Sequence, residues 1–344
     1  MLEIDGSQGE GGGQILRSSL ALSLITATPF RLYNVRAGRK KPGLQPQHLM
    51  SVRSAAKIGG ATIRGDAVGS KDLTFEPGTV TPGRYHFNIG TAGATGLVLQ
   101  TLYLPLAWKT GTPSEITIEG GTHVSTSPCF HFLETTWRAY LHGMGLKTKL
   151  TMERAGFYPR GGGRIHAVIQ PCDRIRPLCL TQRDPIRSVT GFSAVAGLPE
   201  MVAKRQARRA TNRLADRGIE SRISLDQWQG GPGSVLAINL HQAPVPTLFF
   251  GLGARGKPSE AVADEAVDQV LGYVDSDSPV DLHSADQIVL PLALADGPSE
   301  FRTAQITAHL RTNIAVIRMF IDRDIACDGD EGSAGVVRIA AAKV

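Results

Sequence analysis

The chain has few cysteines and lacks a long apolar stretch. Its 344 residues include only four cysteines, Cys129, Cys172, Cys179 and Cys327, and these form no CxxC pair. Since disulfide-bonded proteins carry paired cysteines at higher density, this pattern favours a reduced, cytoplasmic protein. The first five residues lead directly into glycines, so we expect no signal peptide. No run of residues approaches the length of a membrane span, which predicts that no membrane is bound.

Two common phosphate-binding motifs are also incomplete. The glycine-rich stretch at residues 6–13 begins like a dinucleotide-binding turn, but Gln14 stands where the third glycine is required. The sequence GLGARGK at residues 251–257 resembles a P-loop, but Pro258 replaces the Ser or Thr whose hydroxyl would hold magnesium. We therefore interpret 251–257 as a loop that precedes a helix.

The composition describes a soluble globular protein with an anionic partner. Hydrophobic residues make up 42% and charged residues 20% of the chain, enough for a large core, and the length suggests about two domains. The formal net charge is +6. This balance favours nucleic acid or nucleotide as the partner, although many basic proteins bind neither.

Strand, glycine turn and helix recur along the chain and predict an α/β (α+β) fold of repeated units. The first such segment is a strand at 2–5 followed by a helix at 14–26, and the second runs through a small-residue turn at 87–96 into a helix at 97–106. A third glycine turn at 156–163 precedes a strand at 164–169. The spacing indicates a repeated βα unit.

The character of the sequence changes between residues 182 and 279. We expect strands at 188–196, 235–240 and 247–252, a strongly basic helix at 200–217 and a further helix at 259–273. Since glycine turns and apolar helices resume at Asp286, this segment is interpreted as an inserted small α/β domain. Residues 1–181 and 280–344 then form the large catalytic domain.

The stretch 301–320, FRTAQITAHLRTNIAVIRMF, carries the strongest candidate for chemistry. We predict a strand at 304–308 and an apolar-periodic helix with Thr312 as its N-cap. His309 would then lie at a strand end beside a helix N-terminus, where a neutral imidazole can attack a phosphoryl group. The alternative is that His309 is only a polar residue at a strand end.

Other polar residues surround the glycine-rich turns. Glu10 is a carboxylate within a phosphate-binding loop, which implies a divalent cation, and Arg17 is placed to reach the same anion. Arg36 and Arg39 belong to a basic loop that either grips phosphates or is simply solvated. Gln100, on an apolar helix, either satisfies core groups or contacts a ligand.

Two further groups have competing interpretations. Asp286 and Gln287 precede an apolar run, where they either cap a helix or line a pocket. His123, Cys129 and His131 suggest a zinc site, but their spacing fits no common zinc pattern.

Taken together, these segments resemble the RNA 3′-terminal phosphate cyclase family. The matching segments span nearly the whole chain in order: DGSQGEGGGQILR at 5–17, RAGRKKPGL at 36–44, QHL at 47–49, IGTAG at 89–93, LQT at 99–101, GGTH at 120–123, GFYPRGGG at 156–163, DQ at 286–287 and HLRTNIAV at 309–316. The resemblance implies three repeated α/β units, each a small sheet backed by helices, with a smaller α/β domain inserted.

The resemblance also implies an ATP-dependent ligase that closes an RNA 3′-phosphate into a 2′,3′-cyclic phosphate. A histidine attacks the α-phosphorus of ATP and releases pyrophosphate, which leaves AMP linked to the histidine. AMP then passes to the RNA 3′-phosphate, and the neighbouring 2′-OH expels AMP as the ring closes. The implied partners are ATP and RNA with a 3′-phosphate end, and a homodimer is the family-level expectation.

The same resemblance assigns roles to residues of this chain. His309 is the nucleophile, and Glu10 holds Mg²⁺ or Mn²⁺ against the triphosphate. The implied nucleotide-binding residues are Arg17, Gln100, Pro128, His283, Asp286 and Gln287, and the implied RNA or phosphate contacts are Arg36, Arg39 and His48.

The chain departs from the family pattern at two of its positions. His283 stands where many relatives have an aromatic residue such as tyrosine, and Cys129 stands where relatives often continue with proline after Pro128. The departures concern the wall that packs against adenine and leave the chemistry untouched.

Three rival interpretations remain. A non-catalytic cyclase-like protein that binds RNA or assists ribosomal RNA processing would lack the nucleophilic histidine, whereas His309, Glu10 and Arg17 are all present. A plain RNA-binding protein would use the basic helix at 200–217. A ligase that joins RNA ends would share the adenylation, but no segment marks its second step.

Overall fold

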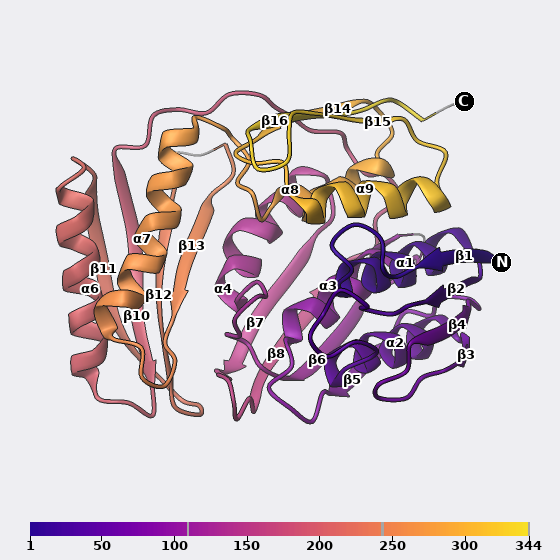
Figure 1. The fold of residues 1–344 in the computed structure, drawn as a ribbon, viewed down its shortest axis with the longest axis horizontal. Coiled ribbons are helices and arrows are strands. Elements are labelled where there is room, and N and C mark those ends of the chain that lie inside the picture. Colours follow the sequence, from indigo (N-terminus) through magenta and orange to yellow (C-terminus); the bar gives the residue numbers. More distant parts are fainter. Residues whose placement is uncertain (109, 242–243, 343–344) are drawn as a thin grey trace.

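The computed structural model describes residues 1–108, 110–241 and 244–342. Within these ranges the chain forms four sheets of four strands each, backed by helices (Figure 1). The predicted α/β class is therefore confirmed. None of the helices formed by these residues has both the length and the hydrophobicity that crossing a bilayer requires.

Three of the four sheets, each with its helices, form three similar units. The first unit comprises β1 (Leu2–Asp5), α1 (Gly13–Thr26), β2 (Phe30–Tyr33), α2 (Pro46–Gly59), β3 (Thr62–Arg64) and β4 (Asp72–Glu76). The second comprises β5 (Arg84–Asn88), α3 (Thr95–Ala107), β6 (Ser114–Gly120), α4 (Phe130–Phe132), the π-helical turn η1 (Leu133–Trp137), α5 (Arg138–Gly143), β7 (Thr148–Arg154) and β8 (Gly163–Ile169). The third comprises β9 (Cys179–Leu180), α8 (Ala285–Ala293), β14 (Ser299–Thr303), α9 (Ala308–Phe320), β15 (Ile325–Asp328) and β16 (Gly335–Ile339).

These units share one strand order, which identifies them as repeats. In each unit the first two strands pair in parallel, and the second, fourth and third strands follow as antiparallel neighbours, as in β1-β2-β4-β3. The orders β5-β6-β8-β7 and β9-β14-β16-β15 repeat it. A parallel pair requires a crossover connection, and the helices α1, α3 and α8 lie on these connections.

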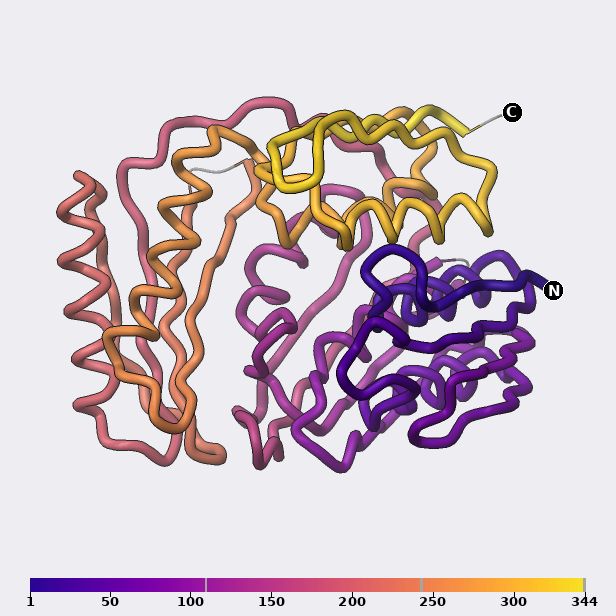
Figure 2. The backbone as a smooth tube through the Cα atoms, viewed as in Figure 1, coloured from indigo at the N-terminus to yellow at the C-terminus, as the bar shows by residue number. Residues whose placement is uncertain are grey.

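The fourth sheet has a different order and interrupts the third unit. It comprises β10 (Ser188–Ala196), α6 (Glu200–Ala215), β11 (Glu220–Trp228), β12 (Gly233–Leu240), β13 (Thr247–Leu252) and α7 (Ser259–Ser276), with the order β11-β10-β12-β13. We call these elements the insert unit. They stand between β9 and α8 in the chain, and both crossings to them lie at one end of the unit, at the top of Figure 2. The exact boundaries at residues 182 and 279 stay a prediction.

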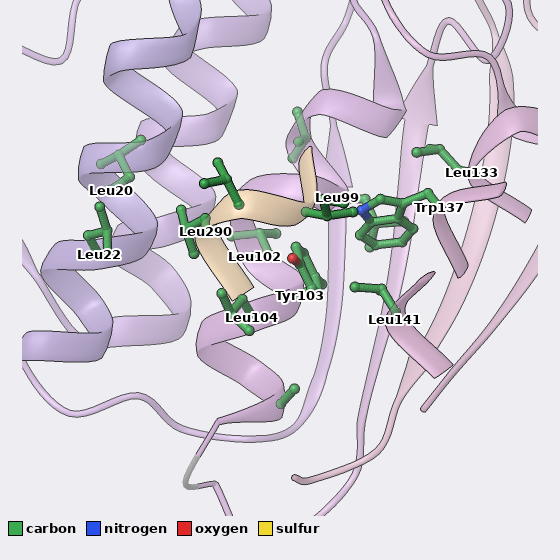
Figure 3. Packing of buried hydrophobic residues seen from close by; sticks show 14 of the residues in the cluster. Leu20, Leu22, Leu99, Leu102, Tyr103, Leu104, Leu133, Trp137, Leu141 and Leu290 are labelled. Carbon is green, nitrogen blue, oxygen red and sulfur yellow. The ribbon is translucent and has the colours of Figure 1, made fainter. Parts of the chain in front are cut away.

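One hydrophobic core runs through the three repeated units. Helices α1, α3, α8 and α9 pack against one another between the sheets, with apolar side chains from each in a single cluster. Figure 3 shows Leu20 of α1 and Leu290 of α8 facing the leucines of α3. The ring of Tyr103 meets that of Trp137 edge to face, with 4.7 Å between the centroids. This close packing holds α1, α3, α8 and α9 rigidly against one another.

The basic side chains of α6 are turned toward the acidic side chains of α7. Arg205 pairs with Glu260 at 3.0 Å, Arg209 with Asp264 at 2.8 Å, and Arg217 with Asp275 at 2.7 Å. Arg213 contacts both Asp264 and Asp268. Much of the positive charge that the sequence places on this helix is thus balanced within the insert unit.

The insert unit rests on the second unit through aromatic rings. The ring of His131, in α4, stacks on Trp228 of β11 at 4.9 Å between centroids and meets Phe192 of β10 at 4.6 Å. His123 Nε2 lies 3.2 Å from His131 Nδ1, and His123 is 1% exposed. A neighbouring apolar cluster joins Phe157 of the second unit to alanines of β10. This contact fixes the insert unit against the repeats.

We expect the stability contributed by this histidine pair to fall at low pH. Burial lowers the pKa of His131 to about 4, and burial followed by the charge of His131 lowers the pKa of His123 well below its ordinary value. In the unfolded chain the pKa of a histidine is about 6.5, so the unfolded state takes up protons first as the pH falls. The free energy of unfolding should therefore decrease from about pH 6.5 toward about pH 4.

The substitution His131→Phe tests this expectation because it keeps an aromatic ring and removes the titrating group. Denaturant unfolding at pH 7 and pH 5 should show a pH-dependent loss that is smaller in the variant by up to about 2 kcal/mol. The variant should also be less stable at pH 7, since His123 Nε2 loses its partner. If the free energy of unfolding depended on pH equally in the variant and the wild type, the His123–His131 pair would not be the cause of that dependence.

Candidate functional site

His309 lies in the first turn of α9, close to the glycine loop at residues 6–13. The predicted strand at 304–308 is wrong, because β14 ends at Thr303 and Thr307 caps the helix by accepting the Leu310 N–H at 3.1 Å. Thr312 is therefore not the N-cap. The alternation of buried residues that defines the strand falls on Ser299–Thr303, where β14 pairs with β16. His309 still sits at the start of a helix, within its first turn.

The glycine loop brings Glu10 against His309. His309 Nε2 lies 3.1 Å from Glu10 Oε2, and the side chain of Glu10 is 8% exposed while that of His309 is 50% exposed. Gly12 leaves room for this carboxylate, since a Cβ there would collide with the side chains of Glu10 and Arg39. Gly11 has φ +57°, which a side chain would strain. The loop therefore presents a nearly buried carboxylate to a half-exposed imidazole.

Thr312 holds the same loop from the other side. Its hydroxyl accepts the backbone N–H of Glu10 at 3.1 Å, and it packs so closely on Gly9 that no side chain fits there. His309 and Thr312 are three residues apart in α9 and so share one face of the helix. One helix face thus contacts both the carboxylate and the backbone of Glu10.

Three arginines and a buried histidine surround the carboxylate. Arg39 forms an ion pair with Glu10 Oε2. Arg36 donates to the carbonyls of Lys41 and Gly43 at 2.7 and 2.8 Å, which ties it to its own loop. Burial, with a smaller effect of Arg39, lowers the pKa of Arg36.

Arg17 and His48 are more deeply buried than Arg36 and Arg39. Burial lowers the pKa of Arg17 to about 10, against the opposing charges of Glu10 and Asp286, so Arg17 stays charged at neutral pH. Burial, and then the charge of Arg17, lowers the pKa of His48 to about 3. His48 is 6% exposed, and its Nδ1 has no hydrogen-bond partner among the described residues. Both are neighbours of Gly13, where a Cβ would come within 2.6 Å of His48 Nε2 and 2.9 Å of Arg17 Nη1.

A cavity opens beside Arg17, between α1, α3, α8 and α9. It is partly open to solvent, and the space within it, open solvent included, amounts to ≈ 460 Å³. Apolar residues and several polar ones line it, the latter including Arg17, Gln100, Asp286, Gln287 and Asn313. Gln100 Nε2 donates to Gln287 Oε1 at 2.6 Å. Burial raises the pKa of Asp286 to about 7, against the lowering effect of Arg17. The cavity therefore offers amide groups and a carboxyl that is partly protonated at neutral pH.

The protonation state of His309 follows from the same surroundings. Burial lowers its pKa, Glu10 opposes this, and the charges of Arg17, Arg39 and His283 add to the lowering. The ring is therefore neutral at neutral pH and has a nitrogen lone pair available for attack on an electrophile.

Comparison with known proteins identifies the chain. A family model described as RNA 3′-terminal phosphate cyclase matches residues 8–327. The chain belongs to this family.

Its relatives are similar over almost their whole length. An RNA 3′-terminal phosphate cyclase of Ralstonia nicotianae is 43% identical over 339 residues, which cover 98% of this chain and 96% of that protein. One of Koribacter versatilis is also 43% identical, over 98% of this chain and 94% of that protein. One of Caldivirga maquilingensis is 41% identical over 94% of each chain. Among solved structures, the match to the enolpyruvyl transferase NikO of Streptomyces tendae covers 98% of this chain and 81% of that chain. Its TM-score of 0.28 and identity of 12% make it a weak similarity.

The structure brings together most of the residues that the cyclase family pattern assigns. His309, Glu10 and Arg39 are in contact, and Arg17, Gln100, Asp286 and Gln287 line one cavity. His283 is exposed beside α8, and its charge acts on His309. Pro128 does not line this cavity, and its carbonyl lies 3.4 Å from where a Cβ of Gly96, in α3, would be.

Two buried polar residues of the site, Asn313 and Asp281, make hydrogen bonds that were not predicted. Asn313 Oδ1 accepts from Ser18 Oγ and its Nδ2 donates to the Asp286 carbonyl, both at 2.6 Å. Asp281 accepts the N–H groups of His283 and Ser284 at 2.9 and 3.0 Å, so it, and not Asp286, satisfies backbone donors before α8. A sequence signal existed for Asn313, because a buried amide in an apolar helix requires partners.

Glu10 fits a divalent cation held together with phosphates. Its Oε1 is buried and has no hydrogen-bond partner among the described residues. Those residues include no group of three or more His, Cys, Asp or Glu side chains able to enclose a metal. Since Mg²⁺ is commonly held by one or two carboxylates and substrate phosphates, a single carboxylate with an unpaired oxygen suits it.

The residues of the alternative zinc interpretation are engaged elsewhere. Cys129 Sγ accepts the Phe132 N–H at the start of α4, and burial raises the pKa of this thiol to about 12. A thiolate ligand is thus unfavourable at this position.

We predict that Thr312→Val lowers the rate at which a nucleotide reacts at the site. The variant keeps the shape of the side chain and removes the acceptor of the Glu10 N–H, so the carboxylate is no longer fixed. We expect about a tenfold slower reaction with ATP and a higher divalent-cation concentration at half-maximal rate. Thr312→Ser should restore both.

Thr136→Val is the matched control. Thr136 is fully buried and its hydroxyl accepts the backbone N–H of Leu248 at 2.8 Å, a bond that does not involve the glycine loop. Both valine variants should unfold about 1–2 kcal/mol more easily, but only Thr312→Val should change the cation dependence. Equal effects on that dependence would refute a positioning role for Thr312.

Proposed function

We propose that the protein is an RNA 3′-terminal-phosphate cyclase (ATP), a nucleotidyl-transferring ligase. It converts an RNA 3′-terminal phosphate into a 2′,3′-cyclic phosphate through His309-AMP and RNA-3′-pp-5′-A intermediates and releases pyrophosphate and AMP. The observation that carries the proposal is the neutral, half-exposed His309 held 3.1 Å from Glu10, whose other oxygen is buried and unpaired. Family membership supports the substrate.

The first step is nucleophilic attack by His309 on ATP. A lone pair of the imidazole forms an N–P bond to the α-phosphorus while the bond from that phosphorus to the bridging oxygen breaks, and pyrophosphate leaves with the electron pair. Arg39 and Arg17 offset the charge of the phosphates. Glu10 would hold the divalent cation, which when bound would supply further charge neutralisation of the triphosphate.

The second and third steps need little from the protein beyond position. An oxygen of the RNA 3′-phosphate attacks the phosphorus of AMP, and the N–P bond breaks to return the imidazole. The 2′-OH then attacks the 3′-phosphorus, loses its proton and expels AMP. Since this hydroxyl is already tethered next to its target, proximity supplies much of the rate.

The nucleoside part of ATP is assigned to the cavity beside Arg17. Gln100 and Gln287 offer amide donors and acceptors, and Asp286 with a pKa of about 7 both donates and accepts. His283 and Pro128 are assigned to adenine. Arg36, Arg39 and His48, on the loop and helix that follow β2, are assigned to the RNA terminus. A cytoplasmic location and a homodimer stay predictions.

The non-catalytic, cyclase-like alternative is disfavoured by the assembled site. A factor that only binds RNA or assists ribosomal RNA processing has no need of a neutral imidazole beside a buried carboxylate. The interpretation as an RNA-binding protein that uses α6 is disfavoured by the ion pairs that join Arg205, Arg209 and Arg217 to acids of α7.

The first test is covalent labelling. Purified protein incubated with α-labelled ATP and Mg²⁺ or Mn²⁺ should give a labelled band on a denaturing gel, acid-labile and alkali-stable, and His309→Ala should give none. Added RNA with a 3′-phosphate should discharge the label, while RNA with a 3′-hydroxyl should not. No label with any cation would overturn the proposal at its first step.

The second test concerns the cation. Glu10→Gln keeps the size of the side chain but removes the charge, so adenylation should be at least about 100-fold slower and should need more cation. Glu3→Gln is the matched control, because Glu3 is an exposed carboxylate on β1 that pairs only with Arg31 among the residues described. If the Glu10→Gln variant kept the cation dependence of the wild type, Glu10 would not be a ligand of the cation.

A further inference from the structure

The loop that joins β7 to β8, residues 155–162, carries an exposed aromatic side chain. Tyr158 is 73% exposed, and it is the one aromatic residue among the large hydrophobic side chains that are exposed in the described part of the chain. It belongs to the GFYPRGGG segment, to which the proposed reaction gives no role. In Figure 1, β7 runs toward the lower edge of the molecule, away from α9, and the antiparallel β8 runs back from that edge.

The loop is held rigidly in spite of this exposure. The Gly161 N–H donates to the Phe157 carbonyl at 2.7 Å, and Arg154 Nε donates to the Gly162 carbonyl at 2.5 Å. Gly156 exchanges two hydrogen bonds with Thr122, at 2.8 and 2.9 Å. Phe157 is 3% exposed and packs under the insert unit. The exposed ring is therefore presented by a fixed turn, and its binding surface is organised in advance.

Two arginines belong to the same turn or border it in the sequence. Arg160 and Arg154 are exposed, and neither has an acidic partner within ion-pair distance among the described residues. Arg164, two residues beyond this turn, differs because it pairs with Glu119 and Glu153. An exposed aromatic ring on the same turn as guanidinium groups that have no acidic partner is a combination that suits single-stranded nucleic acid.

A continuous series of contacts joins this loop to the catalytic site. Gly161 lies against Ala92, whose Cα would be 2.8 Å from a Cβ at Gly161. The next residues of that loop meet α2, because the Ala94 N–H donates to Gln47 Oε1 at 3.0 Å. His48 follows Gln47 and meets Gly13 beside Arg17. The residues between the two places are therefore packed loops and the first turn of α2.

Two glycines on these loops, Gly90 and Gly162, have no side chain packed over them. Gly90 and Gly162 have φ of +74° and +70°, and nothing lies within 4 Å of where a Cβ would be at either position. At these points the backbone is open to a ligand, and no side chain covers it. Exposed Lys40 and Lys41 add positive charge at the end nearest Arg39.

We propose that Tyr158, Arg160 and Arg154 form a second RNA site that holds the single-stranded body of the substrate, on the 5′ side of the reacting end. One base stacks on Tyr158, and the arginines contact phosphates of the strand that leads past the residue 90–93 loop and His48 to His309. Since every base has an aromatic face, this site is tolerant of sequence. The inference rests on the proposed function for its substrate.

The test compares a dinucleotide and an oligonucleotide of about ten residues, both with a 3′-phosphate. Wild-type protein should have a lower KM for the longer RNA. Tyr158→Ala and Arg160→Ala should raise that KM about tenfold, and leave kcat, the KM of the dinucleotide and the rate of labelling by ATP unchanged. Tyr158→Phe, which keeps the ring, should behave like wild type.

Arg208→Ala is the matched control, because it removes an exposed arginine from α6 of the insert unit. It should leave the advantage of the longer RNA intact. If Tyr158→Ala keeps that advantage, or raises both KM values equally, the second site does not exist as proposed. If wild type gives no label with ATP, the proposed function fails separately, and binding of labelled oligonucleotide to wild type and Tyr158→Ala still tests the surface.

Discussion

The site depends on the contact between the glycine loop before α1 and the first turns of α9. Glu10 is held at two points by one helix face, through its carboxylate by His309 and through its backbone by Thr312. Neither partner is local, since Glu10 and Thr312 are 302 residues apart in the chain. The imidazole of His309 and the carboxylate of Glu10 therefore meet only when the first and third units pack together.

The repeat explains how this contact arises. Each unit places helices over a small sheet, and the helices of all three units share one apolar core. The cavity of the site forms where α1, α3, α8 and α9 meet, because side chains from all four helices line it. Buried polar bonds then fix the register, as with Asn313, which joins Ser18 of α1 to the carbonyl of Asp286 in α8. Packing supplies the stability, and the buried polar groups select one arrangement because each must be satisfied.

Much of the fold followed from sequence periodicity, and the remainder depended on distant partners. β1, β10 and β13 have the predicted bounds, and α1 begins one residue early. The threefold repeat came from the family resemblance. The strand before His309 was misplaced because residues 304–308 alternate as a strand would, while the pairing with β16 falls on Ser299–Thr303.

The residues that gather at the site were easier to name from the sequence than the contacts between them. Glu10 and Arg17 were indicated by the glycine turn at 6–13, and His309 by the start of an apolar-periodic helix. The sequence did not indicate that α9 contacts Glu10 through both His309 and Thr312. Thr312 was predicted to be a helix cap because the partner of its hydroxyl, the Glu10 N–H, lies far away in the sequence. Likewise, the charge pattern of α6 suggests nucleic acid until the acids of α7 are seen beside it.

The insertion between β9 and α8 also sets an order of folding. The Leu178 N–H donates to Ser299 Oγ across 121 residues, and the two-residue strand β9 pairs with β14 over a similar separation. Contacts of such long range carry a large loop-closure entropy and form late. On a ribosome, the first two units can be complete before the third has emerged. His309 therefore joins the site among the last events of synthesis, so the incomplete chain carries Glu10 but not yet its histidine partner.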